Sequence, residues 1–538
     1  MKNLLLLSVF LTFGCSAPQG EQAETHRPNI FLIVADDLGY SDLGIYGGDI
    51  STPNIDELAK SGLLFTRFHT AVMCAPTRAM LLSGNENHLA GVGSQSGGTG
   101  IFAGKFGYEG YLTNRIVPFP LLLLDAGYHT YITGKWHLGR TRETSPAAKG
   151  FERSWVMEDG AGNHYNDVSL FDNDSSTYRE DGELVNYPEG EYSTEFYTNK
   201  LIQYIEGNLN DGKPFFAFAA LTTPHWPLQV PQQFDNYKGR YDPGYDSLRC
   251  LRFQSLKKAG IIPEQAKFPE RLEGIIPWNE LSEEQKKIEA RKMELYSAMV
   301  ENLDYHVGRM IQFLKDKNLF ENTLIVFMSD NGAAAEDFYS KLREGSDLYG
   351  YYDNSYENMG KPNSFVSYGP PWAMAGSAPF NRHKSYPTEG GISAPLIMRG
   401  VNIPANGEIR HDYLTVMDLA PTFLEIAGIG YPELQGTENT PPMAGVSLLP
   451  FLKGENTIVH DENYVTQHEH RLRLYVRKGD WKLVSIDLPV KEENFRLYNL
   501  ATDLAESKDL KQEFPEVYNE LLTEWHKYVE EARIIIPE

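Results

Sequence analysis

The sequence predicts an α/β fold with a large, mainly parallel sheet between layers of helices, and a smaller α+β domain at its C-terminal end. Four apolar runs of strand length lie at 29–35, 128–133, 214–220 and 323–329, and each one ends in polar residues. Continuous apolar runs are typical of strands that are covered on both faces. Helical patterns separate these runs, and such alternation favours a parallel sheet.

The longest of the predicted helices begins near Ser282. Its apolar residues from Leu295 to Leu314 recur every three or four positions, which traces a single apolar helix face. The other elements that we expect in this part of the chain are helices at 56–61, 119–126, 193–209 and 413–426, a strand at 394–398, and an irregular insertion at 235–279.

The domain organisation follows from length and from a change of pattern. A chain of 538 residues is too long for one small core. After the prolines at 441–442, short alternating strands are predicted at 473–477, 481–486 and 495–500, followed by a helix at 515–533. The expected units are a signal peptide with a lipobox at 1–15, a tether at 16–27, a large domain at 28–455 and a small α+β domain at 456–538.

Composition and charge limit the classes of partner. Hydrophobic residues make up 41% and charged residues 23% of the chain, which is typical of a globular protein. The formal net charge of −24 argues against nucleic acid as a partner and against binding to anionic membranes through the general surface. An anionic substrate would therefore need a local basic pocket.

The first fifteen residues predict export. A charged start at 1–3 precedes the short apolar run 4–13, which is too short to span a bilayer. Gly14 and Cys15 resemble a bacterial lipoprotein box, so we expect a periplasmic or cell-surface lipoprotein that is held to the membrane only through a lipid on Cys15. Ordinary signal cleavage nearby is the alternative. The other two cysteines, Cys74 and Cys250, form no disulfide framework.

The segment CAPTR at 74–78 predicts a reactive site at the start of a helix. Pro76 suits a first helical turn, which places Cys74 at the helix N-terminus, where the helix dipole favours negative charge. Arg78 follows one turn later on the same face. These residues indicate a nucleophile beside an anion site, although a packing cysteine next to a surface arginine has the same local pattern.

Two strand ends carry oxygen ligands. Asp36 and Asp37 follow the first apolar run, and Asp330 and Asn331 follow the last. Ligands of parallel sheets bind beyond the carboxyl ends of the strands, so these side chains are expected to converge. Three carboxylates and an amide oxygen suit Ca²⁺ or Mg²⁺ rather than zinc. Taken singly, each pair also fits a turn or a helix cap.

A second set of residues around the same crevice is basic. Lys135 and His137 follow one predicted strand, His225 follows another, and Lys384 lies in a turn. Singly, such histidines are more often structural and such lysines are more often solvated. Together with Arg78 they would form a cationic pocket that suits an oxyanion and supplies a proton to a leaving group.

These motifs resemble those of the type I sulfatases in the alkaline phosphatase superfamily. The matching segments are CAPTR at 74–78 with LSG at 82–84, DDLGY at 36–40, GKWHLG at 134–139, PH at 224–225, SDNG at 329–332, Lys384 before EGG at 389–391, and WKL at 481–483 with LYNL at 497–500. The segment NHLAGVG at 87–93 is most similar to bacterial arylsulfatases. The resemblance implies the alkaline phosphatase/sulfatase-like fold, with 28–455 as the catalytic domain.

The resemblance also implies an activity, the hydrolysis of sulfate esters to an alcohol or phenol and inorganic sulfate. In this family a maturation enzyme oxidises the cysteine that corresponds to Cys74 to Cα-formylglycine. One hydroxyl of the hydrated aldehyde attacks sulfur, and the second then expels sulfate by re-forming the aldehyde. The expected substrates are sulfated small molecules, either aryl sulfates or sulfated carbohydrates.

By matched position, the resemblance assigns a role to each candidate residue. Asp36, Asp37, Asp330 and Asn331, together with residue 74, would hold one Ca²⁺ ion. Arg78 and Lys135 would stabilise the diol and the sulfate, and His137 would be the base for aldehyde re-formation. His225 and Lys384 would protonate or stabilise the leaving oxygen.

Two other functions remain open on the sequence alone. One is a phosphonate or phosphate diester hydrolase that uses the same site, and the other is a non-catalytic protein that binds a sulfated ligand. The substrate is not readable from the expected specificity loops at 93–115, 160–173 and 336–379. The role of His164, in loop packing or substrate contact, is also open.

Overall fold

The computed structural model of the protein describes residues 27–169, 175–341, 352–401, 403–404, 406–431 and 441–537. Ten strands of this part of the chain form a central sheet. Cys15, the expected signal peptide and nearly all of the tether lie outside the described residues, as do 170–173 and 342–351 of the expected specificity loops. The strands of this sheet are β1 (Asn29–Ala35), β2 (Leu63–His69), β3 (His129–Lys135), β4 (Arg153–Met157), β5 (Tyr178–Glu180), β6 (Glu183–Val185), β7 (Phe215–Ala220), β8 (Thr323–Ser329), β9 (Ser393–Arg399) and β10 (Glu408–Thr415).

The strand order is β10-β2-β9-β8-β1-β7-β3-β4-β5-β6. The five strands from β8 to β4 run parallel, and β10 is parallel to β2. β9 is antiparallel to both of its neighbours, and β5 and β6 form an antiparallel edge. The prediction of a large, mainly parallel sheet is confirmed, and the four apolar runs are the adjacent strands β1, β3, β7 and β8.

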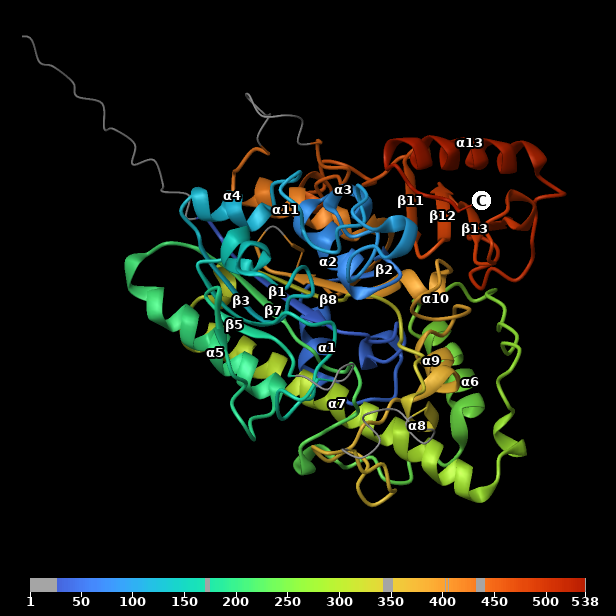
Figure 1. Cartoon of the computed structure of the whole chain (residues 1–538), viewed down its shortest axis with the longest axis horizontal. Coiled ribbons are helices and arrows are strands. Elements are labelled where there is room, and N and C mark those ends of the chain that lie inside the picture. Colours follow the sequence, from blue (N-terminus) through green and yellow to red (C-terminus); the bar gives the residue numbers. More distant parts are fainter. Residues whose placement is uncertain are drawn as a thin grey trace, which may run out of the picture.

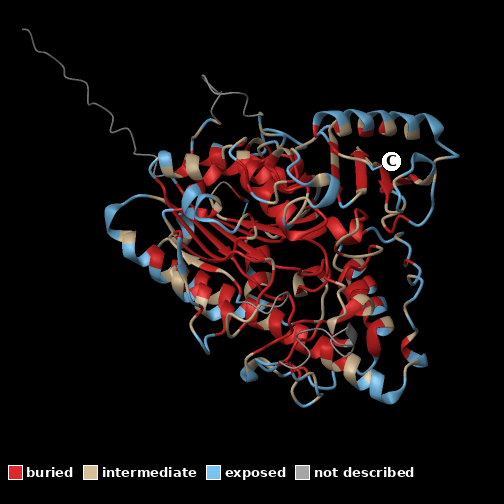
Figure 2. Cartoon of the chain, in the orientation of Figure 1, coloured by how far each residue is buried: buried red, intermediate tan, exposed pale blue. Residues whose placement is uncertain are grey.

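The sheet is covered on both faces, as its apolar runs predict. Successive side chains of a strand point to opposite faces. Phe31, Ile33 and Ala35 belong to one core, and Ile30, Leu32 and Val34 belong to the other. Figure 2 shows the sheet as a continuous buried layer between helices that are exposed on their outer sides.

Two layers of helices provide these cores (Figure 1). The first core contains residues of α1 (Pro53–Lys60), α5 (Ser193–Asn208), α6 (Gly244–Lys258), α7 (Glu283–Asp316) and α9 (Gly369–Gly376). The second contains residues of α2 (Cys74–Ser83), α3 (Asn87–Ala90), α4 (Phe119–Asp125), α11 (Leu419–Ile426) and α12 (Leu449–Leu452). Two further short helices are α8 (Phe338–Lys341) and α10 (Glu389–Ile392). Among the described residues, no helix combines the length and apolar character needed to cross a bilayer.

The long helix α7 begins where the sequence predicts. Ser282 is its N-cap, and its hydroxyl accepts a hydrogen bond of 3.2 Å from the Gln285 backbone amide. The Gln285 side chain accepts one of 2.8 Å from the Ser282 amide, so the two residues form a capping box. The predicted apolar face, which includes Leu295, Met299 and Leu303, is fully buried against the sheet.

A second, four-stranded antiparallel sheet lies near the C-terminal end of the chain. Its strands are β11 (Val465–His470), β12 (Arg473–Lys478), β13 (Trp481–Ser485) and β14 (Arg496–Asn499), in that order. The helix α13 (Pro515–Glu531) covers one face and buries Leu521, Trp525 and Tyr528 in a separate core. Figure 1 shows this small α+β unit beside α3 and α10.

Two predicted elements are wrong. The segment 235–279 is not wholly irregular, because it contains the fifteen-residue helix α6. The buried face of α6 includes Arg252, which pairs with Asp42 and Asp49, and this charged residue interrupts the apolar pattern that would indicate a helix. The segment 413–426 is not one helix, because residues 413–415 end β10 and pair with β2 before α11 begins at Leu419.

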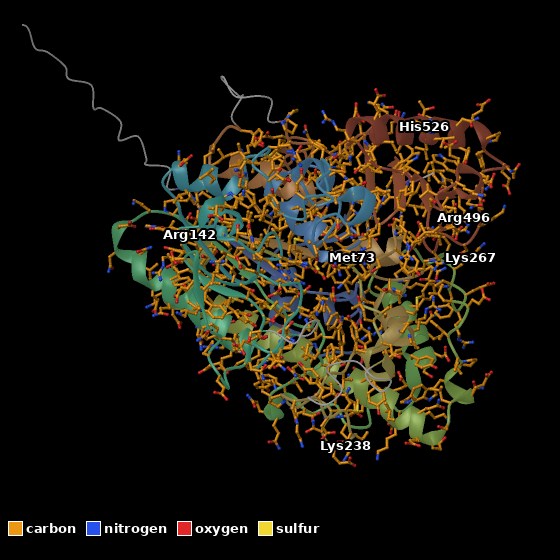
Figure 3. The ribbon with its side chains drawn as sticks, in the orientation of Figure 1. Met73, Arg142, Lys238, Lys267, Arg496 and His526 are labelled. Carbon is orange, nitrogen blue, oxygen red and sulfur yellow. The ribbon has the colours of Figure 1, made fainter. Side chains whose placement is uncertain are left out.

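The strand order brings the polar strand ends together. Because β8, β1, β7 and β3 are adjacent and parallel, their carboxyl ends lie along one stretch of the sheet edge. Asp330 follows β8, Asp36 follows β1 and Lys135 ends β3. Met73, just before α2, lies near the middle of the molecule in Figure 3, away from labelled peripheral residues such as Arg142 and His526.

Candidate active site

Cys74 is the first residue of α2, as predicted, and Pro76 lies in its first turn. The Cys74 side chain is buried, with 2% of the residue exposed. Its Sγ lies 3.3 Å from Nδ1 of His137 and 3.7 Å from Nε2 of Gln95. Burial raises the pKa of the Cys74 thiol, although Lys135 and Lys384 oppose that shift. The encoded side chain is therefore a protonated thiol at neutral pH, which is a poor nucleophile.

Three carboxylates and three cations meet beside Cys74, and they pair one to one. The pairs are Lys135 with Asp36 at 2.7 Å, Lys384 with Asp37 at 2.8 Å, and Arg78 with Asp330 at 2.8 Å. All six side chains are at most 3% exposed. Removing one member of such a buried pair leaves an uncompensated charge, which typically costs about 3–5 kcal/mol. The basic residues of the predicted pocket are therefore also the counter-ions of the predicted metal ligands.

The four predicted oxygen ligands form one cluster. The backbone amide of Asp37 donates to Asp330 at 3.2 Å, and Nδ2 of Asn331 donates to Asp37 at 2.7 Å. One ligand atom each of Asp36, Asp330 and Cys74 lie within 4.8 Å of one another. The carboxamide oxygen Oδ1 of Asn331 is buried and has no hydrogen-bond partner among the described residues. A cation beside it would satisfy this oxygen, and the donor set fits a hard cation.

The backbone and the electrostatics of this cluster are both unusual. Asp37 has φ of 66°, in the left-handed region that non-glycine residues seldom occupy, and such residues are concentrated at functional sites. Burial raises the pKa of Asp36 against the attraction of Lys135, and the negative charges of Asp330 and Asp37 add to the rise. The pKa of Asp37 shifts in the opposite direction. Burial would raise it, but the attraction of Lys384 and His225 outweighs that effect and lowers the pKa.

His137 lies just after β3, with its ring against Cys74. It also adopts a left-handed conformation, with φ of 59°. Gly160 packs on the ring, and a Cβ at that position would approach its Cε1 to 2.5 Å, so a side chain there would displace the imidazole. Burial and the neighbouring Lys135 and Arg78 lower the pKa of His137 well below its usual value. The imidazole is therefore neutral near pH 7 and able to accept a proton.

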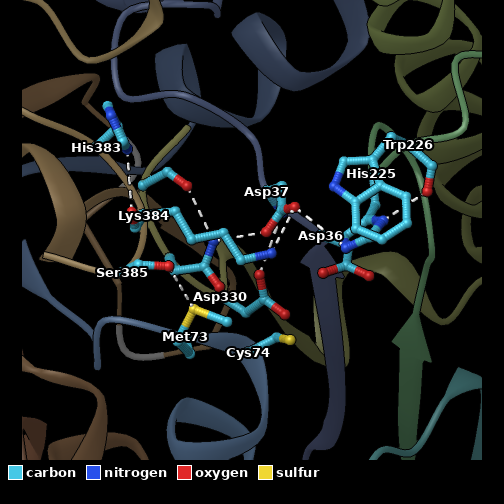
Figure 4. Close-up of polar contacts among 12 residues, drawn as sticks. Asp36, Asp37, Met73, Cys74, His225, Trp226, Asp330, His383, Lys384 and Ser385 are labelled. Atoms are coloured by element: carbon cyan, nitrogen blue, oxygen red, sulfur yellow. Dashed lines mark hydrogen bonds and ion pairs between the residues drawn. The ribbon is translucent and has the colours of Figure 1, made fainter. Parts of the chain in front are cut away.

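His225 lies on the other side of the carboxylates. Figure 4 shows Asp37 between Lys384 and His225, and Nε2 of His225 is 3.3 Å from Asp37. Nδ1 of His225 is 2.6 Å from the carbonyl oxygen of Trp226, whose ring also packs against the imidazole. Burial lowers the pKa of His225 well below its usual value, although Asp37 opposes the shift. Both ring nitrogens thus have fixed partners.

All ten predicted site residues lie in this one region, but other residues of the site were not predicted. Gln95 contacts Cys74 and accepts a hydrogen bond of 3.1 Å from Arg471, in the turn after β11. His164, whose role was open, is a packing residue. It is buried and contacts the carbonyl oxygen of His225 at 3.1 Å and the hydroxyl of Ser193 at 2.7 Å. No local sequence pattern marks these contacts, because each joins distant segments.

The known proteins to which this chain is similar are sulfatases. The sulfatase family profile matches residues 28–429, and the profile for the C-terminal part of N-sulphoglucosamine sulphohydrolase matches 382–534. The chain is 38% identical over 533 residues to an uncharacterized sulfatase of Schizosaccharomyces pombe, and the match covers 96% of both chains. It is 38% identical over 448 residues to an arylsulfatase of Klebsiella aerogenes, covering 82% of this chain and 94% of the relative.

Two more distant similarities are to a mammalian relative and to a solved structure. An N-acetylgalactosamine-6-sulfatase of Canis lupus familiaris is 27% identical over 513 residues, covering 89% of this chain and 76% of the relative. The crystal structure of Ps i-CgsB in complex with k-i-k-neocarrahexaose superimposes with a TM-score of 0.66 at 24% identity, covering 94% of this chain and 93% of that one. The second similarity concerns the fold alone.

Proposed function

The chain belongs to the sulfatase family and is a sulfuric ester hydrolase, and we propose that it works through a Cα-formylglycine made from Cys74 beside one Ca²⁺ ion. The observation that carries this proposal is the position of the Cys74 sulfur. It lies in a buried cluster with ligand oxygens of Asp36 and Asp330, and His137 is 3.3 Å away. A cysteine that served only for packing would not need these neighbours.

The oxygen cluster fits the proposed cation. Asp36, Asp37, Asp330 and Asn331 offer only oxygen ligands, and the unpartnered Oδ1 of Asn331 needs an electropositive neighbour. When bound, the ion would draw electron density from a sulfate oxygen and so favour attack on sulfur. Oxygen ligands alone do not separate Ca²⁺ from Mg²⁺, and the assignment of Ca²⁺ rests on the family.

Residue 74 and His137 form the proposed nucleophile site. The hydrated aldehyde would supply the attacking oxygen, which the protonated thiol of the encoded cysteine supplies poorly. His137, neutral because burial lowers its pKa, would accept a proton from an oxygen on residue 74. Lys135 and Arg78 keep the adjacent carboxylates compensated, and they would share their positive charge with an incoming sulfate.

His225 and Lys384 would act on the leaving oxygen. Both contact the same oxygen of Asp37, at 3.3 and 2.8 Å, so they converge on one point of the cluster from its two sides. The buried cation Lys384 would offset the negative charge that develops as the alcohol or phenol departs. His225, whose pKa burial lowers, would become the proton donor once the negative charge of the bound sulfate ester raises that pKa again. Positioned acid–base groups of this kind typically contribute about 10²-fold or more to the rate.

The experiment that tests the proposal concerns the chemical state of residue 74. Protein from its native host is digested, and the peptide that contains residue 74 is examined by mass spectrometry. We expect the aldehyde form, together with turnover of 4-nitrophenyl sulfate. Cys74→Ser should give no multiple turnover, because a sulfated serine lacks the second oxygen that releases sulfate. An unmodified thiol in active protein, or full turnover by Cys74→Ser, would overturn the proposed chemistry.

We also propose that the protein is exported and carries a lipid on Cys15. The charged start, the apolar run 4–13 and the Gly14-Cys15 pair support this. Membrane association in labelled cells should be lost in Cys15→Ala. Cys250→Ala is the matched control, because Cys250 is an exposed free cysteine in α6. Membrane association that survives Cys15→Ala would refute lipidation.

A further inference from the structure

A cavity of about 930 Å³ opens from the candidate active site. His137 and Gln95, which both contact Cys74, form one end of it. From there the cavity follows the loops at 109–115 and 139–149. Its volume is near the upper end of the range of about 300–1,000 Å³ that is typical of ligand pockets. A substrate whose sulfate lies at residue 74 would therefore have room to extend along this wall.

Most charges of the cavity wall are compensated within the protein. The pairs are Arg115 with Glu109 at 2.5 Å, Arg140 with Asp159 at 2.6 Å, and Arg179 with Glu158 at 2.9 Å. Arg115 also packs over the ring of Phe106, at 4.2 Å. These side chains are thus held in place and contribute little net charge to a ligand.

Among the described charged residues of the wall, Lys149 and Glu143 form no ion pair, and of these two only Lys149 is buried. It ends the short 3-10 turn Pro146–Lys149, lines the cavity and is only 4% exposed. Its ammonium group donates to Oδ1 of Asn114 at 2.7 Å and forms no ion pair with a carboxylate of the described residues. Burial lowers the pKa of Lys149, and no neighbouring charge opposes this shift. Buried charges are normally paired, so this ammonium group lacks the partner that burial calls for.

Other polar groups of the wall also lack partners. The hydroxyl of Thr113 and Oε2 of Glu158 are buried and have no hydrogen-bond partner among the described residues. Both residues line the cavity, and they are 6% and 1% exposed. Buried polar groups without partners are uncommon, and a ligand that is rich in hydroxyl groups would satisfy them. The cavity wall thus contains both a cation without an ion pair and buried polar atoms without hydrogen-bond partners, and these are two independent observations.

We propose that this cavity binds a second anionic group, a sulfate or a carboxylate, of a carbohydrate whose sulfate ester is cleaved at residue 74, and that Lys149 contacts that group. The ammonium group would donate a charge-assisted hydrogen bond to the anion while Asn114 keeps it oriented. Hydroxyl groups of the sugar would meet Thr113 and Glu158. This inference rests on the proposed function, because it takes the reacting sulfate to lie at Cys74.

The test compares substrates that differ only in their second charge. The wild-type protein, Lys149→Gln and Lys149→Arg are assayed with 4-nitrophenyl sulfate and with a panel of disaccharides. Each disaccharide is used with one sulfate, with two sulfates, and with one sulfate and one carboxylate. We expect Lys149→Gln to lower kcat/KM for the doubly anionic sugars about 10- to 100-fold, as for the loss of a hydrogen bond to a charged group. Activity on 4-nitrophenyl sulfate should stay within about twofold.

Controls separate this inference from the proposed function. Lys453→Gln removes a lysine that is exposed to solvent and should affect no substrate. Binding of the same disaccharides to Cys74→Ala, measured by calorimetry, tests the cavity without turnover, so a failure of the chemistry does not hide the result. Lys149→Arg should retain most of the binding, and the preferred second group identifies sulfate or carboxylate. No preference for doubly anionic sugars in the wild type, or an equal loss on every substrate in Lys149→Gln, would overturn the inference.

Discussion

Arg471 donates a hydrogen bond of 3.1 Å to the side-chain oxygen of Gln95, across 376 positions of the sequence. Arg471 lies in the tight turn between β11 and β12, with φ of 54°, so the small C-terminal sheet presents it to the large sheet's domain. The amide nitrogen of the same glutamine is 3.7 Å from the Cys74 sulfur. The C-terminal unit thus reaches the candidate nucleophile through one intermediate side chain.

This relationship predicts that Gln95 and Arg471 act as a unit. Gln95→Ala should lower kcat/KM for 4-nitrophenyl sulfate about 10-fold, which corresponds to one lost hydrogen bond of about 1.4 kcal/mol. Arg471→Ala should have a smaller effect, because Arg471 is exposed and acts only through Gln95. The double variant should be no worse than Gln95→Ala. Arg496→Ala, at the periphery in Figure 3, is the control. Losses that simply add would contradict the coupling.

The second prediction concerns the cation. Calcium should raise the melting temperature of the metal-depleted protein, because a ligand that binds only the folded state stabilises it. Asn331→Leu should reduce this response and should lower activity about 10²-fold or more, because it removes an oxygen from the cluster. Differential scanning calorimetry with increasing Ca²⁺, with Mg²⁺ as the alternative ion, measures the response independently of turnover.

Asn302 provides a matched control for this measurement. It is a buried asparagine of α7 whose side-chain oxygen and nitrogen also lack partners among the described residues, but it is not one of the predicted ligands. Asn302→Leu should leave the calcium response unchanged, whatever it does to stability. An equal loss of response in both variants, or no response in the wild type, would count against the proposed site.

The third prediction is a pH dependence of stability at Glu86. Burial raises the pKa of Glu86 from its ordinary value of 4.5 to about 8. Because the folded protein holds this proton more tightly than the unfolded chain, the stabilising contribution is complete below pH 4.5. It is lost as the pH rises towards 8. Glu86→Gln should therefore stabilise the protein increasingly from pH 5 to pH 8, by an amount on the order of a few kcal/mol.

Urea unfolding of the wild type and Glu86→Gln across this pH range measures the effect. Glu57→Gln on the exposed face of α1 is the control for the general effect of replacing a glutamate by glutamine. A constant difference between Glu86→Gln and the wild type would mean that Glu86 titrates normally in the folded protein.

The sequence predicted the sheet and the strand ends because both depend on local patterns. Fully buried parallel strands need apolar residues at every position, and the polar residues that follow them collect at one edge. The failure at α6 has a physical cause. Arg252 can occupy the buried face of α6 because Asp42 and Asp49 neutralise its charge. These two partners lie 210 and 203 positions away in the chain. Local periodicity contains no information about such a partner.

The same reasoning explains which site residues were found. Asp36, Lys135 and Asp330 follow strands whose adjacency the fold class implies, so their convergence could be predicted. Gln95 and Lys149 lie in loops, and their importance depends on what faces them across the cavity. Lys149 is notable because it is buried and forms no ion pair with a carboxylate of the described residues, which a sequence does not reveal. Loop residues of this kind set specificity, so the substrate is less predictable than the reaction.

The last prediction concerns the leaving group and uses His164 to test the position of His225. A proton donor matters most when the departing oxygen is a strong base, as in a sugar alcohol, and least for 4-nitrophenolate. His225→Ala should therefore lower kcat/KM by about 10²-fold or more for sulfated sugars, and by about 10-fold or less for 4-nitrophenyl sulfate.

His164 holds the backbone of His225 through a contact of 3.1 Å to its carbonyl oxygen. His164→Ala should reproduce the same substrate dependence more weakly, because it displaces the donor without removing it. His526→Ala, on the exposed face of α13, should affect neither substrate. Equal losses on both substrates in His225→Ala would show that His225 has another role, such as supporting Asp37, and that the leaving oxygen takes its proton elsewhere.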